Sequence, residues 1–344
     1  MATAEQPRIT VLGAGAWGTA LASALARNGL PVNLWGRDAA TVDAINQRSE
    51  NVRYLPGCAL PSGIEASTDL TTSVQAADYL LLAVPSYAFR SLLRELAPAA
   101  PPHQPFIWAC KGLEPDTHLL MHEVVAAEYG DQAPPHGVIS GPSFAREVVA
   151  GLPTALTVAS ADARFASAVV DWFHGGGMRA YSNPDLIGVQ LGGALKNVLA
   201  IACGIADGLG FGANARAAVI TRGLAELMRL GEAMGGRAET LMGLAGLGDL
   251  VLTCTDDQSR NRRFGLAIAR GLDADAACAE IGQAVEGLRT ARAAAALAAR
   301  HGLDMPIVNE VHAVLHAGRP PRDAVTRLLE RDPKQEIPHD GRSN

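Results

Sequence analysis

The chain has 344 residues, 48% hydrophobic and 19% charged, so it can bury a substantial core and is long enough for about two domains. Its 29 lysines and arginines stand against 35 aspartates and glutamates. The resulting net charge of −6 argues against nucleic acid or a membrane surface as a partner for the whole chain, and any anion site must therefore be local.

Compartment signals point to a cytoplasmic protein. The first residues lack the basic flank and apolar core of a secretory signal. The longest apolar stretch, Leu191 to Phe211, contains Lys196 and Asp207, so we expect a buried helix and no membrane span. Five widely spaced cysteines, none in C-x-x-C spacing, predict reduced thiols with no disulfide and no zinc: Cys58, Cys110, Cys203, Cys254 and Cys278.

The first predicted element is a strand over 9–12, followed by a glycine turn and a helix that stops at Asn28-Gly29. The spacing G-x-G-x-x-G has a physical reason at each glycine. Gly13 permits a tight turn, Gly15 lets a pyrophosphate approach backbone amides, and Gly18 allows close packing of helix on strand. The helix N-terminus then favours an anion, so the segment predicts a dinucleotide site.

A second strand is expected over Pro31 to Arg37. In NAD-specific sheets an acidic residue at the end of this strand binds the ribose, whereas here Gly36 and Arg37 stand there. Arg37 suits a 2′-phosphate, which predicts that NADPH is accepted. Asp38 follows directly and offers an acceptor for the ribose, and a solvated Arg37 is the alternative.

The apolar run Asp78 to Ser86 is typical of a parallel strand covered on both faces, and a helix is expected over 87–96. The next strand, 106–110, leads into Lys111. Because ligands of open α/β sheets lie beyond the carboxyl ends of the strands, Lys111 is placed to meet a charged substrate or a cofactor phosphate. A merely solvated lysine is the alternative.

The pattern repeats over 137–140, where the strand ends in Gly141-Pro142-Ser143. Ser143 is expected to cap a helix that begins near Phe144, or to face a ligand. Further strands are expected over 154–159 and 178–181, completing the sheet.

From Leu186 the pattern turns helical, with Ala/Leu/Gly-rich segments over 186–206, 214–234, 261–270, 285–300 and 306–316. We therefore expect a Rossmann-like, doubly wound α/β domain over 1–185 and an all-α domain over 186–331. Residues 332–344 have neither periodicity nor enough apolar side chains to order themselves.

Lys196 is the most informative residue of the second half, because it interrupts an apolar run with no carboxylate within ten residues on either side. Burial should lower the pKa of such an ammonium toward the range useful for proton transfer. Gly192 and Gly193, one turn earlier, are expected to leave room for a substrate. The alternative is a lysine that reaches solvent from a helix edge.

Two further segments carry candidate chemistry. Asp249 follows a glycine-rich stretch and is a candidate to orient Lys196 or a substrate hydroxyl, or else it caps the helix that follows. The segment 259–263, Ser-Arg-Asn-Arg-Arg, gathers three guanidiniums in an acidic protein and predicts a phosphate site, with a basic surface helix as the alternative. His118 and His122 have i, i+4 spacing, but no third ligand is near, so we expect them on a helix surface and no metal.

Taken in order, these motifs resemble bacterial-type NAD(P)-dependent glycerol-3-phosphate dehydrogenases over roughly residues 8–330. The segments that carry the resemblance are Gly13 to Ala20, Ala109 to Gly112, Ser140 to Ala145, Leu195 to Asn197, Gly246 to Leu250 and Ser259 to Asn261. The resemblance implies that dihydroxyacetone phosphate and sn-glycerol 3-phosphate are interconverted with NADPH or NADH, at the entry to glycerophospholipid synthesis.

The resemblance also assigns roles. Lys196 matches the family's proton acceptor. The implied substrate contacts are Lys111, Gly141, Ser143, Lys196, Asp249, Ser259, Arg260 and Asn261. The implied dinucleotide contacts are Ala16, Trp17, Arg37, Lys111, Ala145, Arg260, Ala284 and Glu286, beside Gly13, Gly15 and Gly18. Position 284 departs from the larger aliphatic residue that is frequent in the family.

The expected mechanism has the nicotinamide delivering hydride to the C2 carbonyl while Lys196 supplies a proton, with Ser259, Arg260 and Asn261 holding the phosphate. Two rivals remain open at this stage. A β-hydroxyacid dehydrogenase has the same layout but a carboxylate substrate, and a dinucleotide-sensing regulator has no turnover. The expected partner is a small phosphorylated substrate, and the apolar helical half is compatible with a homodimer.

Overall fold

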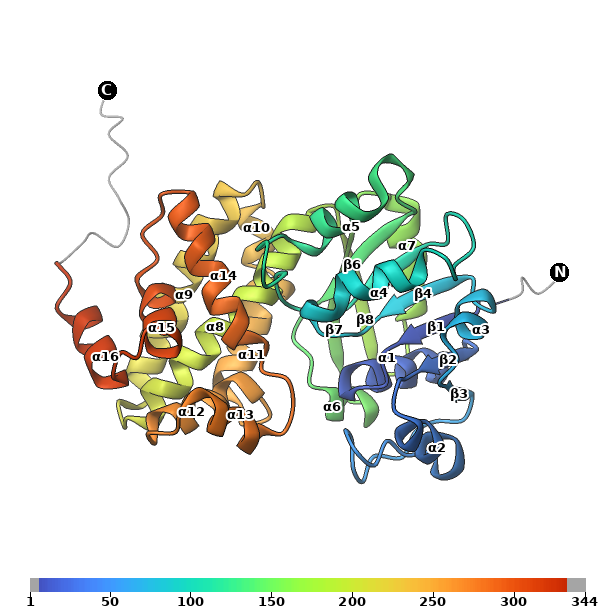
Figure 1. The fold of residues 1–344 in the computed structure, drawn as a ribbon, viewed down its shortest axis with the longest axis horizontal. Coiled ribbons are helices and arrows are strands. Elements are labelled where there is room, and N and C mark those ends of the chain that lie inside the picture. Colours follow the sequence, from blue (N-terminus) through green and yellow to red (C-terminus); the bar gives the residue numbers. More distant parts are fainter. Residues whose placement is uncertain (1–5, 333–344) are drawn as a thin grey trace.

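The computed structural model describes residues 6–332. An eight-stranded sheet comes first and a set of helices follows, which confirms the predicted fold class (Figure 1). The strands are β1 (Ile9–Leu12), β2 (Val32–Trp35), β3 (Ile64–Ser67), β4 (Tyr79–Leu82), β5 (Phe106–Trp108), β6 (His136–Ser140), β7 (Thr154–Ser160) and β8 (Met178–Asn183).

The strand order is β3-β2-β1-β4-β5-β6-β7-β8. Strands β1 to β6 are parallel, β7 runs antiparallel to β6, and β8 is parallel to β7. The chain order reverses between β1 and β4, which is the switch point where open α/β sheets bind ligands. The glycine turn after β1 therefore opens at this point.

Both faces of the central strands are covered, which explains why β1, β4 and β5 are nearly continuous apolar runs. One face packs on α1 (Ala16–Arg27), α6 (Ala145–Val149) and α7 (Ala163–Trp172). The other packs on α3 (Leu70–Gln75), α4 (Phe89–Leu96) and α5 (Met121–Tyr129). Helix α2 (Ala39–Arg48) follows β2, and two short turns, η1 (Ser86–Ala88) and η2 (Gly130–Gln132), precede α4 and follow α5.

The helical part is built around α8 (Leu186–Gly208), which Figure 1 shows running through its middle. Asp185 caps this helix by accepting the Gly188 amide at 2.8 Å, and its other oxygen accepts the Arg237 amide at 2.8 Å. The surrounding elements are α9 (Gly212–Ala233), α10 (Ala238–Leu241), η3 (Leu244–Gly248), α11 (Asp249–Thr255), α12 (Arg260–Ala269), α13 (Ala274–Ile281), α14 (Glu286–Arg300), α15 (Pro306–His316) and α16 (Pro321–Leu329).

By length and composition, α8 is the one helix among residues 6–332 that is apolar enough to cross a membrane, yet 83% of its most apolar window is buried inside the molecule. This burial agrees with the prediction of a core helix. The expected disordered tail falls almost wholly on residues 333–344, which lie outside the described residues.

Candidate active site

A cleft of about 1400 Å³ is lined by the carboxyl ends of the central strands on one side and by α8, α12 and α14 on the other. Most predicted site residues line it: Gly13, Gly15, Ala16, Trp17, Arg37, Lys111, Ser143, Ala145, Lys196, Ser259, Arg260, Asn261, Ala284 and Glu286. Three predicted site residues do not line the cleft: Gly18, Gly141 and Asp249. The fold therefore brings the cofactor and substrate candidates into one space.

The glycine turn has the geometry that a pyrophosphate needs. Gly13 has φ +122°, and a Cβ there would lie 2.7 Å from the Ala83 carbonyl oxygen. A Cβ on Gly18 would lie 1.9 Å from the carbonyl oxygen of Gly13, so this glycine serves the packing of α1. A Cβ on Gly15 would meet nothing within 4 Å, and no side chain caps α1 there. The open amides at Gly15 thus fit the diphosphate of a dinucleotide.

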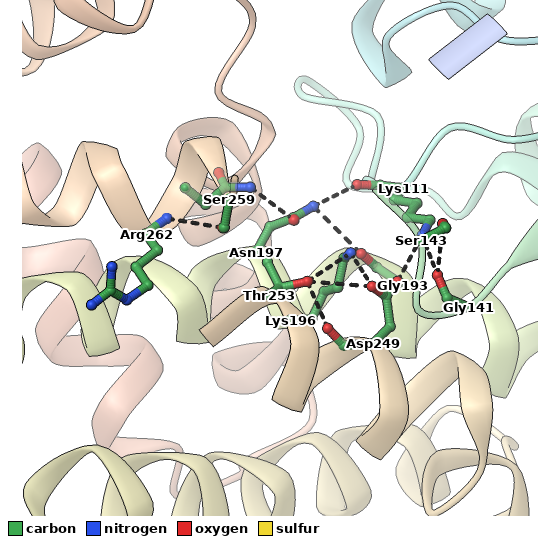
Figure 2. Close-up of polar contacts among 11 residues, drawn as sticks. Lys111, Gly141, Ser143, Gly193, Lys196, Asn197, Asp249, Thr253, Ser259 and Arg262 are labelled. Carbon is green, nitrogen blue, oxygen red and sulfur yellow. Dashed lines mark hydrogen bonds and ion pairs between the residues drawn. The ribbon is translucent and has the colours of Figure 1, made fainter. Parts of the chain in front are cut away.

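Two ammonium groups that line the cleft share one buried carboxylate (Figure 2). Lys196 donates to Oδ1 of Asp249, and Lys111 donates to Oδ2 at 2.7 Å. The Asp249 side chain is fully buried, whereas the side chains of Lys196 and Lys111 are 8% and 13% exposed. Asp249 is thus the missing partner of Lys196, and it lies 53 residues away in sequence.

Burial sets the protonation behaviour of Lys196. Loss of hydration lowers its pKa to about 7; Asp249 opposes this shift, and the neighbouring Lys111 charge reinforces it. The Lys196 side chain projects from α8 and is held in the interior by two residues of α11, Asp249 and Thr253, whose hydroxyl lies at 3.0 Å. It therefore does not reach solvent from a helix edge. A lysine poised near neutral pH can act as either proton donor or proton acceptor.

Lys111 lies three residues beyond the end of β5, because the strand ends at Trp108 and not at the predicted position 110. Its ammonium also donates to the carbonyl of Gly141 at 2.8 Å and lies 5.8 Å from the centre of the Trp17 ring. The alternative of a solvated lysine is therefore wrong. Gly141 contributes its backbone carbonyl to Lys111, although the residue itself does not line the cleft.

Sequence reasoning missed two polar residues of this cluster. Thr253 accepts from Lys196 and donates to the Asp249 carbonyl at 2.6 Å, one helical turn along α11. Asn197 donates to the Lys111 carbonyl at 3.0 Å and accepts from Asn261 at 2.8 Å. The i, i+4 spacing of Asp249 and Thr253 on a helix is the signal that would have found Thr253.

The predicted phosphate segment divides into two groups. Arg260 and Asn261 face the cleft, where Arg260 contacts Gln283 at 3.5 Å and Asn261 also accepts the Gly287 amide at 2.9 Å. Ser259 lines the cleft and caps α12 by accepting the Arg262 amide at 3.2 Å. The guanidinium of Arg262 instead pairs with Asp207 at 2.8 Å and with Asp257. The prediction that the guanidiniums of this segment form a phosphate site is therefore wrong for Arg262, which joins α12 to α8.

Two expectations about small side chains are also wrong. The space beside Gly192 belongs to protein, since a Cβ there would lie 2.4 Å from the Ala245 carbonyl oxygen. A Cβ on Gly193 would lie 2.8 Å from Ser140 Oγ, so these glycines allow close backbone approach and leave no substrate space. Ser143 does not cap α6, because its hydroxyl donates to the Gly141 carbonyl at 3.0 Å and Phe144 is the capping position.

The histidine pair does not lie on a helix surface. His118 has φ +62° in the turn before α5, and only His122 is helical, where its ring meets Gln190 at 3.0 Å. Within residues 6–332, no group of three His, Cys, Asp or Glu side chains could hold a metal ion. All five thiols are unbonded, and burial raises the pKa of Cys110, which lines the cleft.

At the far end of the cleft, Arg37 pairs with Glu95 at 2.8 Å and its side chain is 63% exposed. Asp38 accepts from the Thr41 hydroxyl at 2.5 Å. Glu286 also lines the cleft and accepts from the Ser86 hydroxyl at 2.8 Å, which connects α14 to the turn after β4. Desolvation raises the pKa of Glu286.

This architecture, with a glycine turn at the switch point and a poised lysine opposite it, defines a nicotinamide-dinucleotide-dependent dehydrogenase of the Rossmann type. Two family models match the chain: the NAD-dependent glycerol-3-phosphate dehydrogenase N-terminus over residues 8–166 and its C-terminus over 185–326. The chain therefore belongs to the family of NAD-dependent glycerol-3-phosphate dehydrogenases.

Individual relatives agree. The chain is 59% identical over 333 residues to glycerol-3-phosphate dehydrogenase [NAD(P)+] of Thioalkalivibrio sulfidiphilus, covering 97% of this chain and 100% of the relative. It is 56% identical to the enzyme of that name from Halorhodospira halophila, covering 96% and 98%. The solved structure of glycerol-3-phosphate dehydrogenase from Coxiella burnetii is similar with a TM-score of 0.91 and 49% identity, covering 95% and 99%.

Proposed function

We propose that this chain interconverts dihydroxyacetone phosphate and sn-glycerol 3-phosphate with NADPH or NADH, and that Lys196 moves the proton. The observation that carries the proposal is the pair of ammonium groups on buried Asp249, in the same cleft as an open dinucleotide turn and Arg260. Family membership supports this reaction over the two rivals, a β-hydroxyacid dehydrogenase and a regulator without turnover.

The cofactor would lie with its diphosphate on the glycine turn, its adenosine beside Arg37 and its nicotinamide toward Lys111. Ala16, Trp17, Ala145, Ala284 and Glu286 are the other residues proposed to contact it. When bound in reduced form it supplies a hydride, which the C2 carbonyl carbon of the substrate receives.

Lys196 would donate its proton to the oxygen that was the C2 carbonyl, as negative charge develops there. In the reverse direction the neutral amine takes the proton from the C2 hydroxyl of glycerol 3-phosphate. Asp249 and Thr253 hold the amine in place, since both bond to Nζ. The second ammonium, Lys111, adds a positive charge next to the developing oxyanion and so stabilises it.

The substrate phosphate would lie on Arg260 and Asn261, at the start of α12, with the Ser259 hydroxyl still able to donate. Asn261 is oriented by Asn197, which also bonds to the Lys111 carbonyl. This chain of bonds fixes the spacing between the phosphate site and the lysine cluster. Binding energy at the phosphate is thereby converted into orientation of the carbonyl. Gly141 and Ser143 complete the proposed substrate contacts.

The larger assignments follow from this arrangement. Residues 1–185 would carry most of the cofactor contacts, and 186–331 would supply Lys196 and most of the substrate-binding groups. The reaction feeds glycerophospholipid synthesis, and the unpaired thiols with an acidic surface suit a cytoplasmic enzyme. A homodimer through the helical part is proposed, which light scattering after gel filtration would test.

One assay separates the candidates. NADPH and NADH absorbance are followed with dihydroxyacetone phosphate, and then with a 3-oxo or 2-oxo carboxylate of similar size. The proposal expects oxidation with the phosphate and little with the carboxylates. Preference for a carboxylate would support the hypothesis of a β-hydroxyacid dehydrogenase. If no ketone caused cofactor oxidation, the result would support the hypothesis of a regulator without turnover.

A further inference from the structure

The adenosine end of the cleft carries a basic residue that the strand pattern does not reveal. Arg53 lines the cleft beside Arg37 and Asp38, although it lies in the loop after α2 and not at the end of β2. Its Nη1 donates to Oδ2 of Asp38 at 3.1 Å. Two guanidiniums, Arg37 and Arg53, therefore flank the carboxylate that follows β2.

The position of Arg53 is fixed relative to the glycine turn. Two residues before it, the fully buried Asn51 donates to the Ala14 carbonyl at 2.9 Å and to the Thr19 hydroxyl at 2.8 Å. The Asn51 side-chain oxygen accepts the Tyr54 amide at 3.1 Å, and the Arg53 guanidinium lies 5.2 Å from the centre of the Tyr54 ring. The backbone of the loop is thus bonded to the same turn that receives the diphosphate.

The two ion pairs at this end can be exchanged for a ligand. The side chains of Arg53 and Asp38 are 62% and 43% exposed, and those of Arg37 and Glu95 are 63% and 43% exposed. Exposed ion pairs contribute little because water screens them and long side chains must be ordered. A phosphate dianion that accepts paired N–H groups from a guanidinium is a stronger partner than either carboxylate.

NADPH and NADH differ only by the phosphate on the 2′-oxygen of the adenosine ribose, which lies at the end of β2 in this fold. We propose that Arg53 is a specificity-determining residue that binds this 2′-phosphate together with Arg37. Arg53 leaves Asp38 for the phosphate when NADPH binds. With NADH, Arg53 stays on Asp38, and the free carboxylate oxygen accepts from the ribose hydroxyl. This inference rests on the proposed function only in taking the cleft to bind NAD(P).

The direct test is equilibrium binding without turnover. Calorimetry compares ADP-ribose with its 2′-phosphorylated form on the wild-type chain, Arg53→Gln and Arg37→Gln. Arg53→Gln should lose affinity about tenfold or more for the 2′-phosphorylated ligand, since one charge-assisted contact is removed, and stay within about twofold for ADP-ribose. Arg48→Gln is the matched control, because it removes an exposed charge from the last turn of α2 outside the cleft.

Equal losses for both ligands in Arg53→Gln, or no loss for either, would overturn the inference. Kinetics give the second reading: kcat/KM of Arg53→Gln should fall for NADPH and hold for NADH, whereas Asp38→Asn should do the reverse. If wild-type chain oxidises neither cofactor with dihydroxyacetone phosphate, the proposed function fails. The calorimetry still decides the role of Arg53.

Discussion

Asp249 accepts hydrogen bonds from two ammonium groups while fully buried, and this arrangement controls the proton chemistry of the site. One carboxylate cannot neutralise two cations, so the cluster keeps an excess positive charge in a poorly hydrated place. Burial lowers the pKa of Lys196 to about 7, with the positive charge of Lys111 acting in the same direction and Asp249 opposing it. Lys111 keeps additional contacts with the Gly141 carbonyl and the Trp17 ring.

The first residue-scale prediction concerns pH. Reduction of the ketone needs protonated Lys196, so its single-turnover rate should be highest below pH about 7 and fall as pH rises through that value. Oxidation of glycerol 3-phosphate needs the neutral amine, so its rate should rise through the same range. Rapid-mixing measurements from about pH 6.5 to 9 avoid the substrate phosphate, whose second pKa is near 6. Parallel or flat profiles in the two directions would contradict the assignment.

A second prediction concerns Arg260. Arg260→Ala should raise KM for dihydroxyacetone phosphate by about tenfold or more and change kcat less, because it removes binding that is present before the transition state. Initial rates at saturating cofactor measure this. Arg270→Ala is the control, because it removes an exposed guanidinium just beyond the other end of α12. An unchanged KM in Arg260→Ala would place the phosphate elsewhere.

At the scale of elements, segments with a clear hydrophobic pattern were predicted well, including the four-residue strand β1, and segments without one were missed. The structure contains helices α8, α9, α12, α14 and α15 within a few residues of the predicted segments, because each has an extended apolar face. The short strand β3 and the π-helical turn η3 lack such a signal. Close backbone contacts could not be predicted from the sequence either. Gly192 was predicted to leave room for a substrate, but it lets the Ala245 backbone approach α8.

Helix α15 gives an element-scale prediction about stability. Its first amides, from Ile307 and Val308, donate at 2.8 and 3.1 Å to the carboxylate of Glu226 on α9, which is 1% exposed. Desolvation raises the pKa of Glu226 to about 7, against the opposing effect of these amides and of Arg229. The folded state therefore holds this proton at pH values where the unfolded chain releases it.

Stability from Glu226 is fully present below pH about 4.3 and is lost as pH rises to about 7, by at most about 4 kcal/mol. Glu226→Gln cannot ionise, so the difference in unfolding free energy between wild type and variant should shift in favour of the variant between pH 5 and 8. Urea unfolding at both pH values measures it. A difference that stays the same would show that Glu226 does not titrate on folding.

On the scale of the whole molecule, the site exists only where the sheet and the helical part meet. Lys111 reaches Asp249 across 138 residues of sequence, and Glu286 reaches Ser86 across 200. Arg289 lies 4.1 Å from the centre of the Tyr87 ring at the same boundary. The motifs predicted which residues carry chemistry, but their pairing depends on tertiary packing. The sharing of Asp249 by two lysines therefore could not be predicted from sequence.

The same limit explains the misplaced polar groups. Arg262 belongs to the same basic segment as Arg260, but the helical phase of α12 turns it toward Asp207. Thr253 becomes a site residue because α11 lies beside α8, and Asn197 becomes one because α8 packs against α12 and the Lys111 backbone. Local sequence identifies the elements, whereas the contacts between them decide which side chains face the cleft.

The proposed function depends on proton transfer by Lys196 in a hydride-transfer reaction on dihydroxyacetone phosphate. Its most direct test is the single-turnover rate of NADPH oxidation by wild type and Lys196→Ala, with binding of NADPH checked by fluorescence. If Lys196 moves the proton, the Lys196→Ala variant keeps an intact cofactor site and its rate falls by about 10²-fold or more. A Lys196→Ala protein that binds NADPH and reduces dihydroxyacetone phosphate at a near-normal rate would contradict it.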